Sequence, residues 1–153
     1  MSGLNKIFPG KVIAVASDHA GYNKKMALLD YFEVAGISYK DLGCYSDKSC
    51  DYPDYAHKIA EAIEKNEYEC GITFCGSGQG INITANKHQN IRSALCWNTE
   101  ISKLARAHND SNICAIPSRF VSDEQAIAIV ETFLTSEFEG ERHTRRVEKI
   151  SII

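Results

Sequence analysis

This sequence has little excess charge of either sign and no sign of a targeting segment. The formal net charge is only −3 at pH 7, so no overall positive field exists to attract nucleic acid or an anionic membrane surface. Residues 1–10 contain one lysine and no sustained apolar stretch, which argues against a secretion signal or a membrane anchor. We therefore expect a cytoplasmic protein without nucleic-acid or membrane partners, in which any anion site is local.

The cysteine patterns that bind metals are also missing. The six cysteines are scattered singly, with no C-x-x-C pair and no Cys/His spacing typical of zinc sites. We interpret most of them as small buried side chains of a protein from a reducing compartment. Neither a metal nor an organic cofactor is expected. The six are Cys44, Cys50, Cys70, Cys75, Cys96 and Cys114.

Linkers, low-complexity stretches and fixed-period repeats are absent as well. A chain of 153 residues, 44% of them hydrophobic, can bury a substantial core without disulfide or metal support. We expect residues 1–153 to form one domain.

Short apolar segments alternate with amphipathic segments along the chain. The former are typical of strands buried on both faces, and the latter repeat their apolar residues with helical spacing. This alternation predicts an α/β fold: a three-layer α/β/α sandwich around a five-stranded parallel Rossmann-like sheet, with a basic C-terminal helix. The predicted strands are 11–17, 37–42, 70–75, 91–96 and 112–116, and the predicted helices are 22–35, 54–65, 81–87, 99–108, 122–134 and 141–150.

Three polar clusters lie where predicted strands and helices meet. Open parallel sheets bind ligands outside the carboxyl ends of their strands, and Asp18-His19 and the segment 75–80 are expected there. We place His108-Asn109-Asp110 at the same edge, with the reservation that this cluster ends a helix.

The segment Gly76-Ser77-Gly78-Gln79-Gly80 separates a predicted strand from a helix. Its glycines let the backbone approach a ligand, and free N–H groups at the helix start favour a phosphate or an enediolate oxygen. A tight turn without a ligand explains the same glycines equally well. The segment lacks the lysine of a Walker loop and is a poor dinucleotide fingerprint.

Other polar residues are open to a structural and a functional interpretation. Cys75 is either a buried structural residue or a thiolate stabilised by the following helix. His108 either interacts with the last carbonyls of its helix or acts as a general acid or base. Arg142 and Arg146, four apart on one predicted helix face, form either a solvated basic face, the commoner case, or a phosphate clamp.

Seven short segments carry a family resemblance. They are Ser17-Asp18-His19-Ala20-Gly21, Asp51-Tyr52-Pro53, Cys75-Gly76-Ser77-Gly78-Gln79-Gly80-Ile81, Ala85-Asn86-Lys87, His108-Asn109-Asp110, Ser118-Arg119, and Arg142-His143 with Arg146-Val147. Each is weak evidence alone, but their order and spacing are specific and span nearly the whole chain. In combination they resemble the type B ribose-5-phosphate isomerase family, which also contains the galactose-6-phosphate isomerase subunits.

The resemblance implies a role for each matching residue. Cys75 would be the base that moves a proton between C2 and C1 of the opened sugar, and His108 would open the furanose ring. Another branch of the family has a glutamate where Ile81 stands, so this chain resembles the cysteine branch. Ser77 and the backbone of Gly76, Gly78 and Gly80 would hold the enediolate, Asp18, Tyr52 and Asn109 would contact the sugar, and His19, Arg119, Arg142 and Arg146 would hold the phosphate.

The implied activity is the interconversion of D-ribose 5-phosphate and D-ribulose 5-phosphate, a step of the non-oxidative pentose phosphate pathway. The resemblance also implies a homodimer or a dimer of dimers whose sites combine residues of two subunits. A six-carbon substrate, allose 6-phosphate or galactose 6-phosphate, is the first alternative, although the joint presence of Cys75 and His108 favours the pentose. A non-catalytic phosphosugar-binding module and a redox-sensing role for Cys75 are further alternatives.

Overall fold

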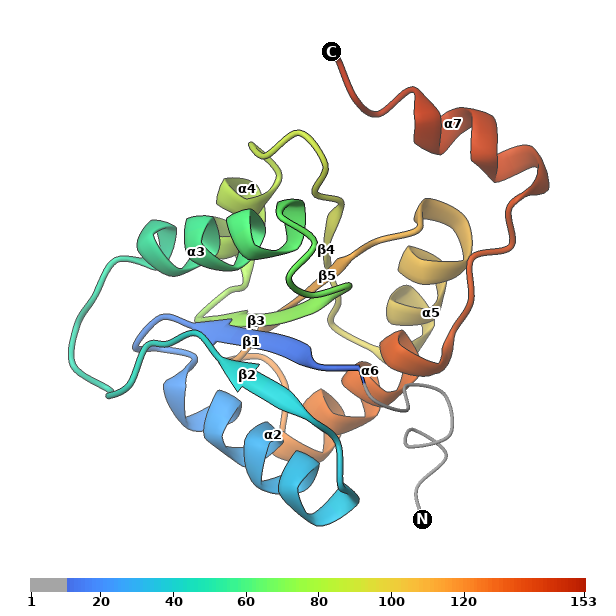
Figure 1. The fold of residues 1–153 in the computed structure, drawn as a ribbon. Coiled ribbons are helices and arrows are strands. Elements are labelled where there is room, and N and C mark those ends of the chain that lie inside the picture. Colours follow the sequence, from blue (N-terminus) through green and yellow to red (C-terminus); the bar gives the residue numbers. More distant parts are fainter. Residues whose placement is uncertain (1–10) are drawn as a thin grey trace.

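A parallel sheet of five strands forms the centre of the computed structural model, which describes residues 11–153 (Figure 1). Its strand order is β2-β1-β3-β5-β4. The three inner strands are buried along their whole length, which explains why they are continuously apolar instead of alternating. The strands are β1 (Ile13–Ser17), β2 (Tyr39–Asp41), β3 (Gly71–Cys75), β4 (Ser93–Leu95) and β5 (Ile113–Pro117).

Helices cover both faces of the sheet and complete the predicted three-layer sandwich. Successive strand residues point to opposite faces, so Val15 packs on one side and Ala14 on the other. The first face is covered by α2 (Tyr22–Ala35), α5 (Thr99–Asn109) and α6 (Asp123–Thr135), and the second by α3 (Tyr52–Glu64) and α4 (Gln79–Ala85). The predicted fold class is therefore confirmed.

Several helix ends follow from local sequence. Gly36 ends α2 in the left-handed region, with φ 72°, as predicted. Ser122 and Gln125 form a reciprocal capping box at the start of α6. Helix α3 begins two residues earlier than predicted, at Tyr52, because Pro53 fits the first turn of a helix, where no N–H donor is required.

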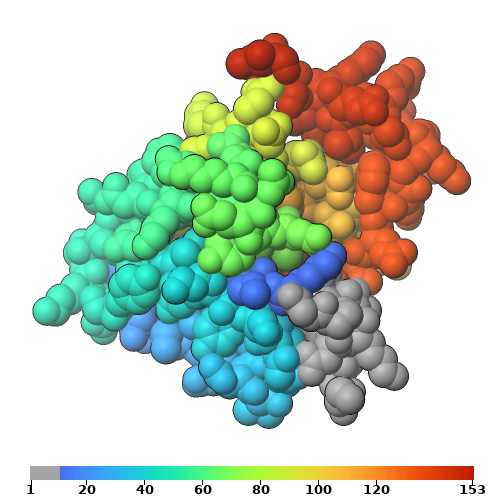
Figure 2. Space-filling view, in the orientation of Figure 1, coloured from blue at the N-terminus to red at the C-terminus, as the bar shows by residue number. Residues whose placement is uncertain are grey.

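The predicted C-terminal helix is shorter than expected and interrupted. A 3₁₀ turn, η1 (Glu141–His143), precedes α7 (Thr144–Glu148). Gly140 and Glu141 both have positive φ, 67° and 49°, which sets the direction in which the segment leaves α6. No residue of α7 is buried, so packing does not extend the helix. Figure 2 shows this segment, in dark red, at the margin of the molecule.

One lysine lies in the core. Lys25 is completely buried, because it occupies the same face of α2 as Leu28 and Phe32. Its ammonium pairs with Asp41 Oδ1 at 2.6 Å and donates a hydrogen bond to the Cys44 carbonyl. The network ties α2 to the loop that follows β2.

Within residues 11–153, no helix has the length and apolar content needed to cross a membrane.

Candidate functional site

The carboxyl ends of β1, β3 and β5 lie level with one another. Ser17 pairs with Phe74, and Cys75 pairs with Pro117. The chain runs from β1 outward to β2 and then returns to β3 on the other side of β1. The ends of β1 and β3 therefore flank the point at which the direction of winding reverses, where open α/β sheets bind ligands.

Cys75 ends β3 at this point and is 4% exposed. Burial raises the pKa of the Cys75 thiol above its ordinary value, and the negative charge of Asp18 adds to the effect. Backbone N–H groups of Ile81, Gly78 and Gly80 act in the opposite direction. The thiol thus lies within a ring of peptide donors that can hold an anion.

Asp18, the first residue after β1, is fixed beside this ring. Its backbone N–H donates to the Phe74 carbonyl at 3.2 Å, and its carboxylate accepts a hydrogen bond from the N–H of Gly21 at 3.0 Å. Asp18 is only 6% exposed, so these contacts with the protein hold its side chain in place.

Tyr52 and Arg119 border the glycine segment. A Cβ atom on Gly80 would lie 2.5 Å from the Tyr52 ring, and one on Gly76 would lie 3.1 Å from the Arg119 guanidinium. The backbone of Arg119 is held as well, since its N–H donates to the Gly76 carbonyl at 3.0 Å. Both side chains therefore lie directly on the loop that surrounds Cys75.

The central glycine of the loop is required on two grounds. Gly78 has φ 75°, and a Cβ atom there would lie 2.5 Å from Leu95 Cδ1. We expect Gly78→Ala to lower the free energy of unfolding by about 1–2 kcal/mol through backbone strain and by roughly 1–3 kcal/mol more through overpacking. Gly36→Ala is the matched control, because Gly36 has φ 72° and ψ 28° in the same left-handed region but is exposed.

Urea unfolding of both variants separates the two costs. The Gly36 variant should lose only the backbone term. An equal loss in the two variants would contradict the packing argument.

His19 and Ser77 lie at the same edge. His19 Nδ1 contacts both the carbonyl and the N–H of Cys50 at 3.2 Å, which connects the β1 turn to the loop after β2. Ser77 is exposed, and its hydroxyl accepts a hydrogen bond from the N–H of Gln79 at 3.3 Å. Asp18, His19, Tyr52, the segment 75–80 and Arg119 are therefore brought together as predicted.

The prediction for His108 was wrong about its position. His108 lies near the C-terminal end of α5, which returns from the carboxyl end of β4 to the start of β5. It therefore lies at the opposite edge of the sheet from Cys75, and a strand of five residues, at about 3.3 Å per residue, separates the two edges. The reason is that a helix that follows a strand of a parallel sheet runs back and ends beside the amino ends of the strands.

The C-terminal arginines share the edge of His108. The N–H of Glu139 donates to the Ala107 carbonyl at 3.0 Å, which anchors the final segment beside α5. Arg142 lies in η1 and Arg146 in α7, so the predicted single helix face is replaced by a turn and a short helix. Asn109 borders a hollow of about 360 Å³ that Ile150 also lines. Among the described residues, the predicted site is thus divided into two groups.

Sequence reasoning assigned no role to Glu139 or His143, two side chains of the second group. The His108 and His143 rings are stacked, with centroids 4.2 Å apart and planes 14° from parallel. Glu139 Oε2 lies 3.9 Å from His108 Nε2 and 3.6 Å from His143 Nε2. Near Cys75, Ser118 belongs to a family-resembling segment but received no role, and its buried hydroxyl has no hydrogen-bond partner. No periodic signal marks Glu139, whose side chain meets His108 only in the folded chain.

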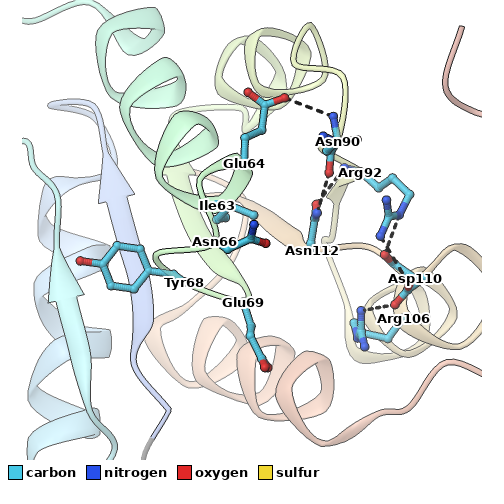
Figure 3. Close-up of a pocket in the computed structure, with 10 residues that line it drawn as sticks. All are labelled: Ile63, Glu64, Asn66, Tyr68, Glu69, Asn90, Arg92, Arg106, Asp110 and Asn112. Atoms are coloured by element: carbon cyan, nitrogen blue, oxygen red, sulfur yellow. Dashed lines mark hydrogen bonds and ion pairs between the residues drawn. The ribbon is translucent and has the colours of Figure 1, made fainter. Parts of the chain in front are cut away.

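Figure 3 shows a larger hollow, of about 520 Å³, which opens beside the residues that precede β3, β4 and β5. Its two arginines are already engaged: Arg92 and Arg106 both contact the Asp110 carboxylate, at 3.4 and 2.9 Å. They also donate to the backbone carbonyls of Asp110 and Ser111. Their charges therefore stabilise the turn before β5. Cys75 is not among the residues that line this hollow.

Comparison with known proteins tests the family resemblance. The Ribose/Galactose Isomerase family matches residues 13–150. Ribose-5-phosphate isomerase B of Escherichia coli K12 is 40% identical over 143 residues, which cover 94% of this chain and 96% of that protein.

Solved structures agree with this match. Ribose 5-phosphate isomerase of Thermotoga maritima has a TM-score of 0.92 at 44% identity, and the alignment covers 94% of this chain and 99% of that one. Ribose-5-phosphate isomerase B of Mycoplasma genitalium, solved with bound ribulose-5-phosphate, has a TM-score of 0.87 at 38% identity and coverage of 92% and 94%. These matches confirm the resemblance: the chain belongs to the ribose/galactose isomerase family.

Proposed function

We propose that this protein interconverts D-ribose 5-phosphate and D-ribulose 5-phosphate. The observation that carries the proposal is the Cys75 thiol, buried at the end of β3 and surrounded by the N–H groups of Gly78, Gly80 and Ile81. Aldose-ketose isomerisation requires a base near a carbon next to a carbonyl and donors for the oxygen that becomes negative. Family membership and the relative with bound ribulose-5-phosphate support the pentose as the substrate.

In this proposal Cys75, as the thiolate, removes the proton from C2 of the opened aldose. The C–H electron pair forms the C1–C2 double bond, and the carbonyl electron pair moves onto O1, whose negative charge is held by Ser77 and the backbone of the glycine segment. The proton of the C2 hydroxyl moves to O1, the C2–O bond becomes the new carbonyl, and the Cys75 thiol returns its proton to C1, which gives the ketose and restores the thiolate. Asp18 and Tyr52 contact the sugar hydroxyls, and His19 and Arg119 bind the phosphate.

The remaining groups come from a second copy of the chain. His108 opens the furanose ring, Asn109 contacts the sugar, and Arg142 and Arg146 bind the phosphate. Because His108 and Cys75 occupy opposite edges of one sheet, two chains must combine to bring them to one substrate. A symmetric dimer does this twice, once at each of two equivalent sites.

Exposed apolar side chains support such an assembly. Trp97 is 51% exposed, Phe120 is 73% exposed and Ile152 is 92% exposed. Helix α7 also has no buried residue, although it carries Arg146. Large exposed apolar groups of this kind are typical of surfaces that another chain covers. We further propose that the protein works in the cytoplasm as a homodimer or a dimer of dimers.

The activity is tested with chelator-treated protein on ribose 5-phosphate, allose 6-phosphate and galactose 6-phosphate in parallel. We expect clear preference for ribose 5-phosphate. Preference for a six-carbon sugar would revise the substrate, and inactivity on all three would favour a phosphosugar-binding module.

The pH dependence follows from the raised pKa of Cys75. Since only the thiolate is a base and burial disfavours it, kcat/KM of the free enzyme should increase through and above about pH 8.5, the ordinary range of a thiol. A pH profile between roughly pH 6 and 10 tests this. A rate that is constant between about pH 7 and 9 would contradict a rate-limiting role for the Cys75 proton.

A further inference from the structure

Three side chains beside α7 converge on one gap that no hydrogen bond closes. Glu139 Oε2 is 3.6 Å from His143 Nε2 and 3.9 Å from His108 Nε2. Both distances exceed those of N–H···O hydrogen bonds. The three ligand-type atoms all lie within 4.8 Å of one another.

His143 makes this gap unusual. The residue is 8% exposed, and its Nε2 is buried without any hydrogen-bond partner. A buried polar nitrogen that lacks a partner costs free energy. Because Nε2 lies 3.6 Å from the Glu139 carboxylate, beside the His108 ring that stacks on the His143 ring, a ligand in the gap would satisfy it.

We propose that His108, Glu139 and His143 bind one divalent transition-metal ion of the zinc type, and that the bound ion inhibits the isomerase. Two imidazole nitrogens and one carboxylate oxygen are a typical zinc donor set, which leaves a fourth position open. Zinc bonds of about 2.0–2.2 Å in tetrahedral geometry separate neighbouring ligand atoms by roughly 3.3 Å. The observed 3.6 and 3.9 Å therefore require an inward movement of Glu139, which is exposed, and a rotation of the stacked His108 and His143 rings that turns both Nε2 lone pairs toward one ion.

Local charge makes the carboxylate the decisive ligand. Arg142 and Arg146 act electrostatically on His143 and oppose a cation. The negative charge of Glu139 offsets them, so metal affinity should depend on this residue most strongly. Inhibition is expected because the ion would coordinate the Nε2 atom of His108. This expectation rests on the proposed ring-opening role of His108.

The test uses reduced, chelator-treated full-length protein titrated with Zn²⁺ by calorimetry and, separately, in the isomerase assay. Wild-type protein should bind one ion per chain and lose activity in parallel with binding. Glu139→Gln keeps the shape of the side chain, and Glu137→Gln is the matched control, because Glu137 is an exposed acid two positions away.

We expect Glu139→Gln to weaken Zn²⁺ binding by about tenfold or more, the loss that removal of even an outer-shell partner can cause. The Glu137 variant should bind like the wild type and keep its basal activity. His143→Gln should also lose binding, which shows that the imidazole is a ligand.

Two results would overturn the site: no binding at stoichiometric Zn²⁺, or equal affinity of the Glu139 variant and the wild type, as expected if Cys75 were the ligand. Binding without inhibition would overturn the regulatory part. Calorimetry does not depend on catalysis, so failure of the metal site can be distinguished from failure of the proposed activity.

Discussion

Cys75→Ala lowers the turnover of ribose 5-phosphate by about 10²–10⁴-fold, the contribution typical of a positioned general base. The variant removes one sulfur atom from the end of β3 and leaves the peptide donors of Gly78, Gly80 and Ile81 in place. Substrate affinity should therefore change much less than kcat. Steady-state kinetics measure both quantities, and circular dichroism reports whether the fold persists.

Cys70→Ala is the matched control for this experiment. Cys70 is the residue immediately before the same strand and lies at its opposite end. We expect near wild-type turnover from the Cys70 variant. If Cys75→Ala also retained most of the turnover, the thiol would have no role in proton transfer, and the binding-module interpretation would gain support.

Mixing two inactive variants restores activity if the site is shared between chains. Cys75→Ala and His108→Ala each remove one partner from every site of a homodimer. In a mixed dimer, one site carries both substitutions and the other carries neither. Random exchange makes half of the dimers mixed, so equal amounts should recover roughly a quarter of the wild-type activity.

The experiment requires subunit exchange, by coexpression or by joint unfolding and refolding, with activity measured before and after. Mixing Cys75→Ala with Arg119→Ala is the negative control, because Arg119 lies on the same chain and at the same edge as Cys75. Recovery confined to the first pair would identify His108 as a residue of the partner's site. Equal absence of recovery in both mixtures would place the two residues of each active site within one chain, contrary to the opposite-edge geometry.

The fold was predictable from the sequence because its signals are local. Five apolar segments, separated by segments of helical periodicity, indicate buried parallel strands wherever they occur in a chain. Gly36 and Ser122 mark helix ends through their own backbone and side-chain chemistry. The buried Lys25 could also have been placed from the spacing of Leu28 and Phe32, although that spacing gives no hint of its partner Asp41.

The candidate site was predictable only in part. Asp18 follows β1 and Cys75 ends β3, and because these two strands are parallel the sheet places both residues together. Position in the sequence is misleading for His108, because the return direction of α5 takes it to the other edge. Both groups of candidate residues can be read from the sequence, but the distance between the groups cannot.

Local backbone preference and hydrophobic pattern therefore determined the strands, the helices and the chemical identity of the candidate residues. Tertiary structure alone decided which of those residues meet. It placed Tyr52 and Arg119 against the glycine segment, separated His108 from Cys75, and stacked His108 on His143. The physical reason is that patterning acts over a few residues, whereas these contacts depend on strand order and on the direction in which each helix crosses the sheet.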